Sequence, residues 1–212
     1  MDKQAREAKE QMKALTPKEK WINFWYYYKM HVIAALFICF LVGMTVTECM
    51  KRIDYDLNIS YYSSAPIDDE GIKALTELMK NSVKDVDGNG TNDVGIASCF
   101  ANPNEKSEQA QAVFVKLSAE VAAGESMAYM VDDTFREIMV RGDYSEGMES
   151  IIEIDGIPEV KDALKLADGQ KLFWMTKSVY ESEKNKAKKV AEHENAVSVE
   201  KMFIEKGAVK IK

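Results

Sequence analysis

The sequence predicts an α/β protein: one N-terminal transmembrane helix, then a single three-layer α/β domain with a mainly parallel sheet. Residues 30–47 carry no full charge and are long enough to cross the hydrocarbon layer of a membrane. In the rest of the chain, apolar runs of strand length alternate with amphipathic helical patterns, which is typical of βαβ units. About 160 residues follow the apolar stretch, enough for one such domain but not for two.

The charge is unevenly distributed along the chain. Residues 1–29 hold seven Lys and Arg against four acids, whereas residues 53–212 hold 19 Lys and Arg against 30 Asp and Glu, a net charge of −11. A domain this acidic repels the phosphates of nucleic acids. We therefore exclude nucleic acid as a partner.

The N-terminal helix is expected to begin well before the apolar stretch. Thr16, Pro17 and Glu19 have the pattern of a capping box with proline at the first helical position. One helix can therefore run from Pro17 to about Met50. Six aromatic residues between positions 21 and 28 lie where the interfacial belt of a membrane helix belongs. The predicted parts are a cytoplasmic basic and aromatic juxtamembrane segment, 1–29; a transmembrane helix, 30–50; and an extracytoplasmic α/β domain, 53–212.

The basic residues predict the orientation of this helix. Seven of them precede the apolar stretch and only Lys51 and Arg52 follow it closely, so the positive-inside rule places the N-terminus in the cytoplasm. A cleaved signal peptide is disfavoured because residues 46–49 offer no small residues before a cut site. A lipoprotein is disfavoured because Glu48 precedes Cys49, and a buried core helix would need no aromatic belt. We expect an uncleaved signal anchor in the cell membrane, surrounded by membrane lipid.

The sequence lacks the signatures of common catalytic sites. It contains no GxSxG, HExxH, phosphate-loop or GxGxxG motif. His31 and His193 are isolated, which disfavours a histidine-based metal site. Cys39 lies in the apolar stretch, so only Cys49 and Cys99 remain for a disulfide, and free thiols are the favoured interpretation. We expect a protein that is not an enzyme.

Five strands are expected in the outer domain. Residues 54–61 alternate polar and apolar side chains, as a half-buried strand does. Residues 94–100 follow a turn-rich stretch, and the apolar run 127–131 suits a buried parallel strand. Residues 151–154 are expected to form a minor strand, and residues 172–175 a stronger one.

Helices are expected between and after these strands. Apolar residues recur there at helical spacing, as in the stripe of Val113, Leu117 and Val121 within residues 104–123. Aspartates placed to cap a helix N-terminus precede two of these patterns. The expected helices begin at Asp68 or Asp69, at Asn104, at Asp132 or Asp133, and near residue 180, the last ending near 206.

The sharpest local pattern is DVDGNGTND, residues 85–93. Oxygen-bearing side chains at its positions 1, 3, 5 and 9, with glycine at 6, match a calcium loop. Position 12 is Ile96 where an EF-hand has glutamate, so the pattern is closer to hairpin-type calcium loops of extracellular repeat domains. A tight turn explains the same residues, because Asp-Gly and Asn-Gly are strong turn dipeptides, and we favour it. The calcium ligands would be Asp85, Asp87, Asn89, Asp93 and the carbonyl group of Thr91.

A solute is expected to bind at the carboxyl ends of the parallel strands, where ligands of open α/β sheets are found. Polar residues follow the expected strands at these points. Ordinary loop positions are the favoured interpretation of each residue taken singly. The candidate ligand-binding residues are Ser63, Ser64, Asn102, Asp132 and Lys177.

Several stretches resemble known families. TPKEKWINFWYYYKMHVIAALFICFLVG, followed by an acidic βαβ domain, resembles single-pass membrane-anchored proteins of Gram-positive, Clostridia-like bacteria. Residues 124–133, GESMAYMVDD, look like a strand and helix cap of periplasmic-binding-protein-like lobes. Residues 155–158 (DGIP) followed by 172–174 (LFW) are similar to a turn and late strand of extracellular solute-binding proteins. The resemblance, over residues 54–205, implies one lobe of a solute-binding protein, at about half the usual length of that family.

Two classes of function follow. The first is a membrane-anchored extracytoplasmic binding or sensing module, non-catalytic, with a small solute as its ligand. The second is a protein-interaction domain, an accessory subunit of a cell-envelope or transport complex. A concave polar pocket would support the first class and a flat apolar patch the second. We favour the binding module.

Overall fold

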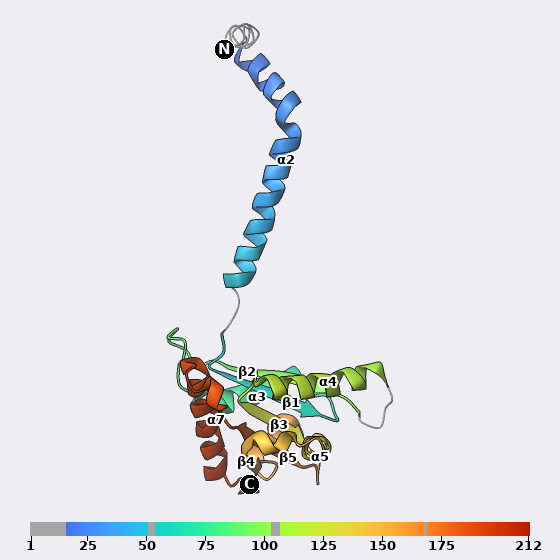
Figure 1. Cartoon of the computed structure of the whole chain (residues 1–212), viewed down its shortest axis with the longest axis vertical. Helices are drawn as coiled ribbons and strands as arrows, with labels where there is room; N and C mark the ends of the chain where they lie inside the picture. The colour runs from blue at the N-terminus through green and yellow to red at the C-terminus, as the bar shows by residue number, and fades with distance from the viewer. Residues whose placement is uncertain (1–15, 51–53, 103–106, 168) are drawn as a thin grey trace. The chain divides into compact units, whose positions relative to one another are not determined.

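The chain divides into two units, Met1–Ile53 and Asp54–Lys212, each with its own architecture (Figure 1). The computed structural model describes residues 16–50, 54–102, 107–167 and 169–212. Some sequence expectations lie outside the described residues: the basic residues before Thr16, the pair Lys51 and Arg52, the helix start at Asn104, and the side chain of Cys49.

The N-terminal unit contains one long helix, α2 (Pro17–Met50), over the range that the sequence predicts. The N–H of Thr16 donates to the Glu19 carboxylate (2.9 Å), and the N–H of Glu19 donates to the Thr16 hydroxyl (3.4 Å). The predicted capping box is therefore present. Within α2, Phe24–Thr45 is apolar and long enough to cross a membrane, and none of it is buried in the structure. This helix is consistent with a single-pass anchor.

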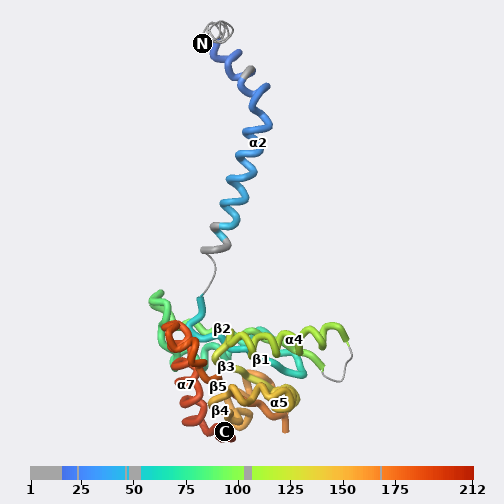
Figure 2. Tube along the Cα trace, in the orientation of Figure 1, coloured from blue at the N-terminus to red at the C-terminus, as the bar shows by residue number. Residues whose placement is uncertain are grey.

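A six-stranded sheet forms the centre of the C-terminal domain, Asp54–Lys212, in the order β2-β1-β3-β5-β4-β6. The strands are β1 (Leu57–Ser63), β2 (Val94–Phe100), β3 (Ala128–Asp132), β4 (Met148–Glu153), β5 (Leu172–Lys177) and β6 (Val209–Lys210). β1 pairs in parallel with β2 and β3. β5 runs antiparallel to β3 and β4, and β6 runs antiparallel to β4, so the C-terminus lies beside β4 (Figure 2).

The sheet is thus mixed, and the prediction of a mainly parallel sheet is wrong. The connection from β4 to β5 contains only α6 (Pro158–Leu164), and its seven residues extend about 10 Å. The six residues of β4 extend about 20 Å. So short a helix does not return the chain to the start of β4, as a parallel crossover requires. The chain therefore enters β5 at the edge where it left β4.

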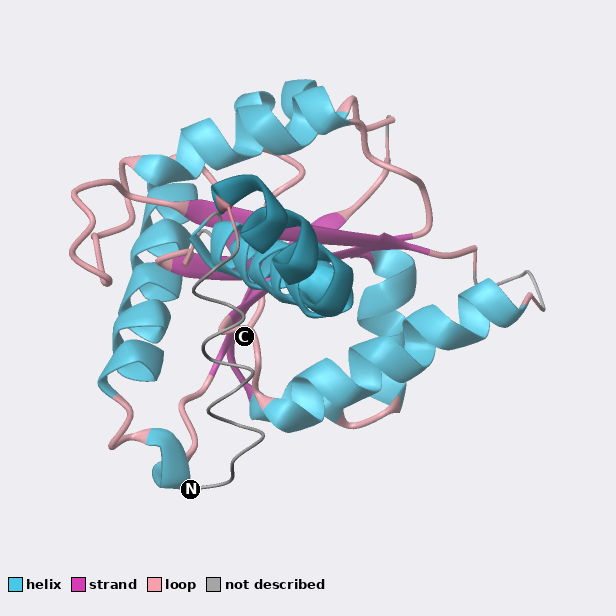
Figure 3. Cartoon of the chain, turned by 90° about the horizontal axis from the view of Figure 1, so that it is seen from above, coloured by secondary structure: helices cyan, strands magenta, loops and turns pink. Residues whose placement is uncertain are grey.

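Helices cover both faces of the sheet and give the three layers that the sequence predicts (Figure 3). On one face, the rings of Trp174 and Phe203 pack at 5.4 Å between centroids; on the other, Tyr62 and Phe135 pack at 5.7 Å. One face carries α3 (Asp69–Lys80), α6 and α7 (Ala187–Glu205), the other α4 (Glu108–Ala123) and α5 (Asp133–Arg141), with 3₁₀ turns at Tyr144–Gly147 and Glu181–Glu183.

Two helices begin at caps that the sequence predicts. Asp68 accepts the N–H of Gly71 at 2.7 Å and starts α3. Asp132 accepts the N–H of Phe135 at 2.9 Å and starts α5. The last helix begins later than expected, at Ala187, after a separate 3₁₀ turn. Local sequence therefore determines where α3 and α5 leave the sheet.

Gly71 permits the close contact between α3 and α6. A Cβ atom at this position would lie 2.6 Å from the carbonyl oxygen of Ala163. We expect Gly71→Ala to push these helices apart and to lower the free energy of unfolding by about 2 kcal/mol. Urea unfolding measures the change. In the control Gly156→Ala no atom lies within 4 Å of the added Cβ, and equal losses in the two variants would contradict the prediction.

Candidate functional site

Asp56, the residue before β1, is a buried aspartate that holds both ends of the acidic loop 85–93. It is 0% exposed. Its Oδ1 accepts the N–H of Val86 at 2.6 Å, and its Oδ2 accepts the N–H of Asp93 at 2.7 Å. Hydrogen bonds to an ionised carboxylate are stronger than neutral ones, so they fix the loop against the start of β1. From the sequence, Asp56 is expected only to be a strand residue.

Inside the acidic loop, side chains accept hydrogen bonds from nearby groups, as in a tight turn. Asp85 accepts the N–H of Gly90 (2.8 Å) and of Gly88 (2.6 Å), and these bonds lower the pKa of the Asp85 carboxyl. Both glycines have positive φ angles, 85° and 78°, which glycine adopts without strain. Asp93 accepts the hydroxyl hydrogen of Thr91 at 2.6 Å. These bonds account for the pattern of aspartates and glycines without a metal.

Three carboxylates nevertheless lie close together at the base of the loop. Asp56, Asp85 and Asp87 each place an oxygen within 4.8 Å of the others. The calcium prediction names Asp85 and Asp87 but not Asp56. Asn89 lies beside Asp87: its amide nitrogen donates to the Asp87 carboxylate at 3.0 Å, and its Oδ1 accepts the N–H of Thr91 at 2.7 Å. Carboxylate oxygens are among the ligands that Ca²⁺ takes, so these three aspartates could hold a hard cation.

Asn195 joins the same loop to helix α7. Its amide nitrogen donates to the carbonyl of Lys84 (2.9 Å) and to the carbonyl of Asp56 (3.0 Å), and its Oδ1 accepts the N–H of Lys84 (2.9 Å). Asn195 is buried, and these bonds satisfy its amide. A signal in the sequence could have revealed it: Asn195 occupies the helical stripe of Val199 and Phe203, where a polar residue needs a buried partner.

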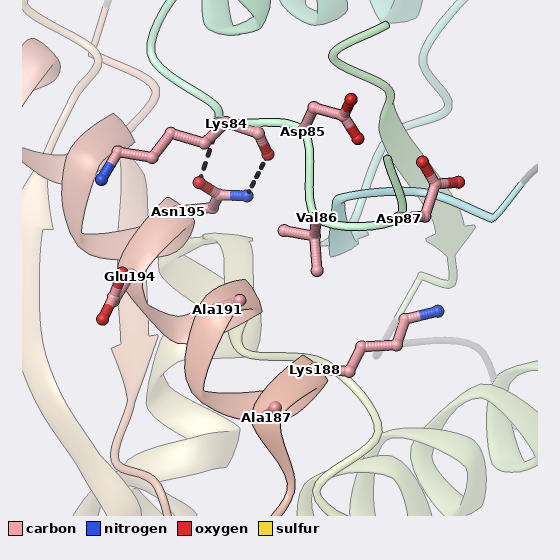
Figure 4. A pocket seen from close by; sticks show the side chains of 9 residues that line it. All are labelled: Lys84, Asp85, Val86, Asp87, Ala187, Lys188, Ala191, Glu194 and Asn195. Atoms are coloured by element: carbon pink, nitrogen blue, oxygen red, sulfur yellow. Dashed lines mark hydrogen bonds between the residues drawn. The ribbon is translucent and has the colours of Figure 1, made fainter. Parts of the chain in front are cut away.

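A pocket of about 350 Å³ lies between residues 84–87 and helix α7 (Figure 4). The side chain of Val86 points from the loop toward the helix, where Ala187 and Ala191 present only methyl groups. This volume falls within the range of about 300–1,000 Å³ that small-molecule sites occupy. The lining residues are Lys84, Asp85, Val86, Asp87, Ala187, Lys188, Ala191, Glu194 and Asn195.

The pocket has charged groups of both signs on its walls. Asp85 and Asp87 come from the loop, and Lys188 comes from α7 on the same side of the pocket as Asp87 (Figure 4). The Lys188 ammonium lies 3.5 Å from a carboxylate oxygen of Asp54, and both side chains are exposed. The sequence assigns no role to Lys188. The pocket therefore combines an apolar floor with a polar, charged rim.

Three of the predicted ligand residues meet at one edge of the sheet. Asp132, at the end of β3, accepts the N–H of Ser64 (2.6 Å) and the hydroxyl hydrogens of Ser64 (2.5 Å) and Ser63 (3.4 Å). They meet because β1 and β3 are parallel neighbours. Asp132 also caps α5, so its carboxylate joins two segments of the fold. These hydrogen bonds link the ends of β1 and β3.

Asn102 lies near the same edge, on a smaller hollow after β2. The hollow has a volume of about 160 Å³, and Ser64, Phe100 and Ser107 also line it. Small-molecule sites are usually larger, about 300 Å³ or more. The pocket beside α7 is therefore the better candidate for a solute.

Lys177 is not brought to this edge. β5 runs antiparallel to β3, with Asp132 opposite Leu172 at the start of β5, so Lys177 lies at the other end of the sheet. Its side chain is fully buried, donates to the carbonyl of Val121 and lies over the ring of Tyr180. A lysine at the last turn of a helix satisfies its free carbonyl groups, and Lys177 has this position beneath α4.

Comparison of the chain with family models, with curated proteins and with solved structures gives no match. The resemblance to lobes of solute-binding proteins therefore stays a prediction from the sequence. The fixed loop and the adjoining pocket are the features of the structure on which a function can be based.

We expect Asp56→Ala to lower the free energy of unfolding of the C-terminal domain by about 3 kcal/mol, because backbone donors of Val86 and Asp93 lose a buried charged acceptor. Thermal and urea unfolding measure the loss. The control Asp54→Ala, two residues earlier, removes an exposed carboxylate whose ion pair contributes less than about 1 kcal/mol. A loss no larger than that of the control would contradict the structural role of Asp56.

The same measurement with calcium and with a chelator separates the two interpretations of the loop. A metal site raises the melting temperature in calcium, and Asp87→Ala removes the rise. A turn held by its own hydrogen bonds melts at the same temperature in both conditions. Magnesium in place of calcium is the control for a general effect of divalent cations.

Proposed function

We propose that the chain is a membrane-anchored binding module, not an enzyme, that holds a small solute in the pocket between residues 84–87 and α7. The observation that carries this proposal is the pocket itself, which has the volume and the apolar floor of a small-molecule site. Its wall is held by two buried side chains, since Asp56 binds the backbone of Val86 and Asn195 binds the backbone of the adjoining Lys84. A wall that is already ordered reduces the entropy lost when a ligand binds.

The proposal takes the C-terminal domain as a single lobe of the solute-binding kind. Three parallel strands, β2, β1 and β3, with helices on both faces support this comparison. The pocket, however, lies beside α7 and not at the carboxyl ends of these strands. A ligand in this pocket would thus be held within one lobe.

The proposal also places the domain outside the cell. The apolar segment Phe24–Thr45 supports an anchor, and the basic residues before it support a cytoplasmic N-terminus. We expect protease added to intact cells to degrade the C-terminal domain and to leave an N-terminal tag intact. Detection of both parts by immunoblot measures this. Protection of the domain until the cells are lysed would contradict the orientation.

A second candidate function is protein interaction, and one observation favours it. β2 is one of the two edge strands of the sheet within the described residues, and its sequence, VGIASCF, carries no charge and no proline. Ala97, Ser98 and Phe100 are exposed, Phe100 at 48%. An unprotected edge can accept a strand from another protein, as an accessory subunit of an envelope or transport complex would provide.

We expect Ala191→Phe to abolish binding, because the larger ring fills the space between α7 and Val86. The purified full-length chain is screened by thermal unfolding against a library of small solutes, and the solute with the largest stabilisation is retained. The variant should lose that shift in melting temperature. Ala122→Phe, an added ring on the exposed side of α4, is the matched control and should keep it. A shift that survives in Ala191→Phe would place the ligand elsewhere.

A further inference from the structure

We infer that the ligand of this pocket is a small zwitterion, a molecule with an ammonium group and a carboxylate group joined by a short apolar chain. The inference rests on the proposed function, because it names the class of solute that the pocket takes. Three features of the pocket carry it: a carboxylate wall, an ammonium group on the opposite element, and an apolar floor.

The carboxylates of Asp85 and Asp87 give one wall of the pocket a negative charge. Asp87 accepts hydrogen bonds from Asn89, through the backbone N–H (2.9 Å) and the side-chain amide (3.0 Å). Within the described part of the chain, neither Asp85 nor Asp87 forms an ion pair with a lysine or arginine. An ammonium group of a ligand at this wall therefore gains a charged partner without displacing one.

The ammonium group of Lys188 provides the opposite charge from the helix side. In Figure 4 its side chain extends from α7 on the side of the pocket where Asp87 stands on the loop. Its partner in the structure is Asp54, at 3.5 Å, and the Lys188 side chain is 52% exposed. An exposed ion pair contributes little free energy, so Lys188 can exchange Asp54 for a ligand carboxylate at low cost.

The floor of the pocket beside these groups is apolar. Val86 stands on the loop, with Ala187 and Ala191 one helical turn apart on α7. A short chain of methylene groups packs on these side chains and leaves both charged ends at the rim. A ligand with only an amine gives Lys188 no new partner. A ligand with only a carboxylate is repelled by the negative charge of the domain. The zwitterion is the class that uses both walls.

Isothermal titration calorimetry on the full-length chain in nanodiscs tests the inference. The probes are a length series of zwitterions: glycine, 3-aminopropanoate, 4-aminobutanoate, 5-aminopentanoate and 6-aminohexanoate. Butylamine and butanoate are the probes with a single charge. We expect at least one zwitterion to bind about tenfold or more tightly than either single-charge probe.

Two variants test the groups that hold the charges. Asp87→Asn and Lys188→Met should each weaken binding of the best zwitterion by about tenfold. Lys184→Met, an exposed lysine outside the pocket, is the matched control and should bind as the natural sequence does. Unchanged melting temperatures of the free variants show that a loss of binding is not a loss of fold.

Some outcomes overturn the inference and leave the proposed function standing. Butylamine binding as tightly as every zwitterion, with Lys188→Met unchanged, identifies a pocket for cations. Butanoate binding more tightly than the zwitterions identifies a pocket for anions. Absence of heat with all zwitterions also overturns the inference, and the solute screen with Ala191→Phe then decides separately whether the pocket binds a solute at all.

Discussion

The buried carboxylate of Asp56 is the constraint on which the rest of this site depends. Removing a carboxylate from water costs several kcal/mol, and this is offset only if strong hydrogen bonds replace the water. Here the backbone N–H groups of Val86 and Asp93 replace it, and both belong to one loop. The need to satisfy one buried charge therefore sets the position of a loop that is otherwise exposed. Asn195 then fixes the adjoining residue, Lys84, to α7.

Under this constraint the backbone and the side chains of the loop have different roles. Backbone N–H groups of the loop bind Asp56, and the adjoining Lys84 binds Asn195, whereas the side chains of Asp85 and Asp87 line the pocket. The turn in the loop and its position near α7 have different causes. The Asp-Gly and Asn-Gly steps bend the chain, and the buried side chains of Asp56 and Asn195 determine where the bend lies. A wall built in this way is ordered before a ligand arrives. Asp85 and Asp87 thus belong both to the carboxylate cluster that could hold a cation and to one wall of the solute pocket.

Features determined by local sequence could be predicted. The capping box of α2, the caps Asp68 and Asp132, and the apolar strand runs all follow from spacing within a few residues. Features determined by long-range pairing could not. The apolar composition of the run that forms β5 fits a parallel or an antiparallel strand equally well. A parallel β5 would place Lys177 at the same edge of the sheet as Asp132, but β5 is antiparallel to β3 and Lys177 lies at the other end. The Asp56 and Asn195 contacts join segments 30 and 111 residues apart, which no local pattern encodes.

Amide hydrogen exchange, resolved by residue in the C-terminal domain, tests most directly whether the loop is held in place. If Asp56 fixes the loop, the amides of Val86 and Asp93 exchange about 100-fold more slowly than the amide of Asn92 in the same loop, and Asp56→Asn reduces this protection. If all three amides exchange at the same fast rate in the natural sequence, the loop is not fixed. The pocket wall would then not be preformed, and the account of the site would be contradicted.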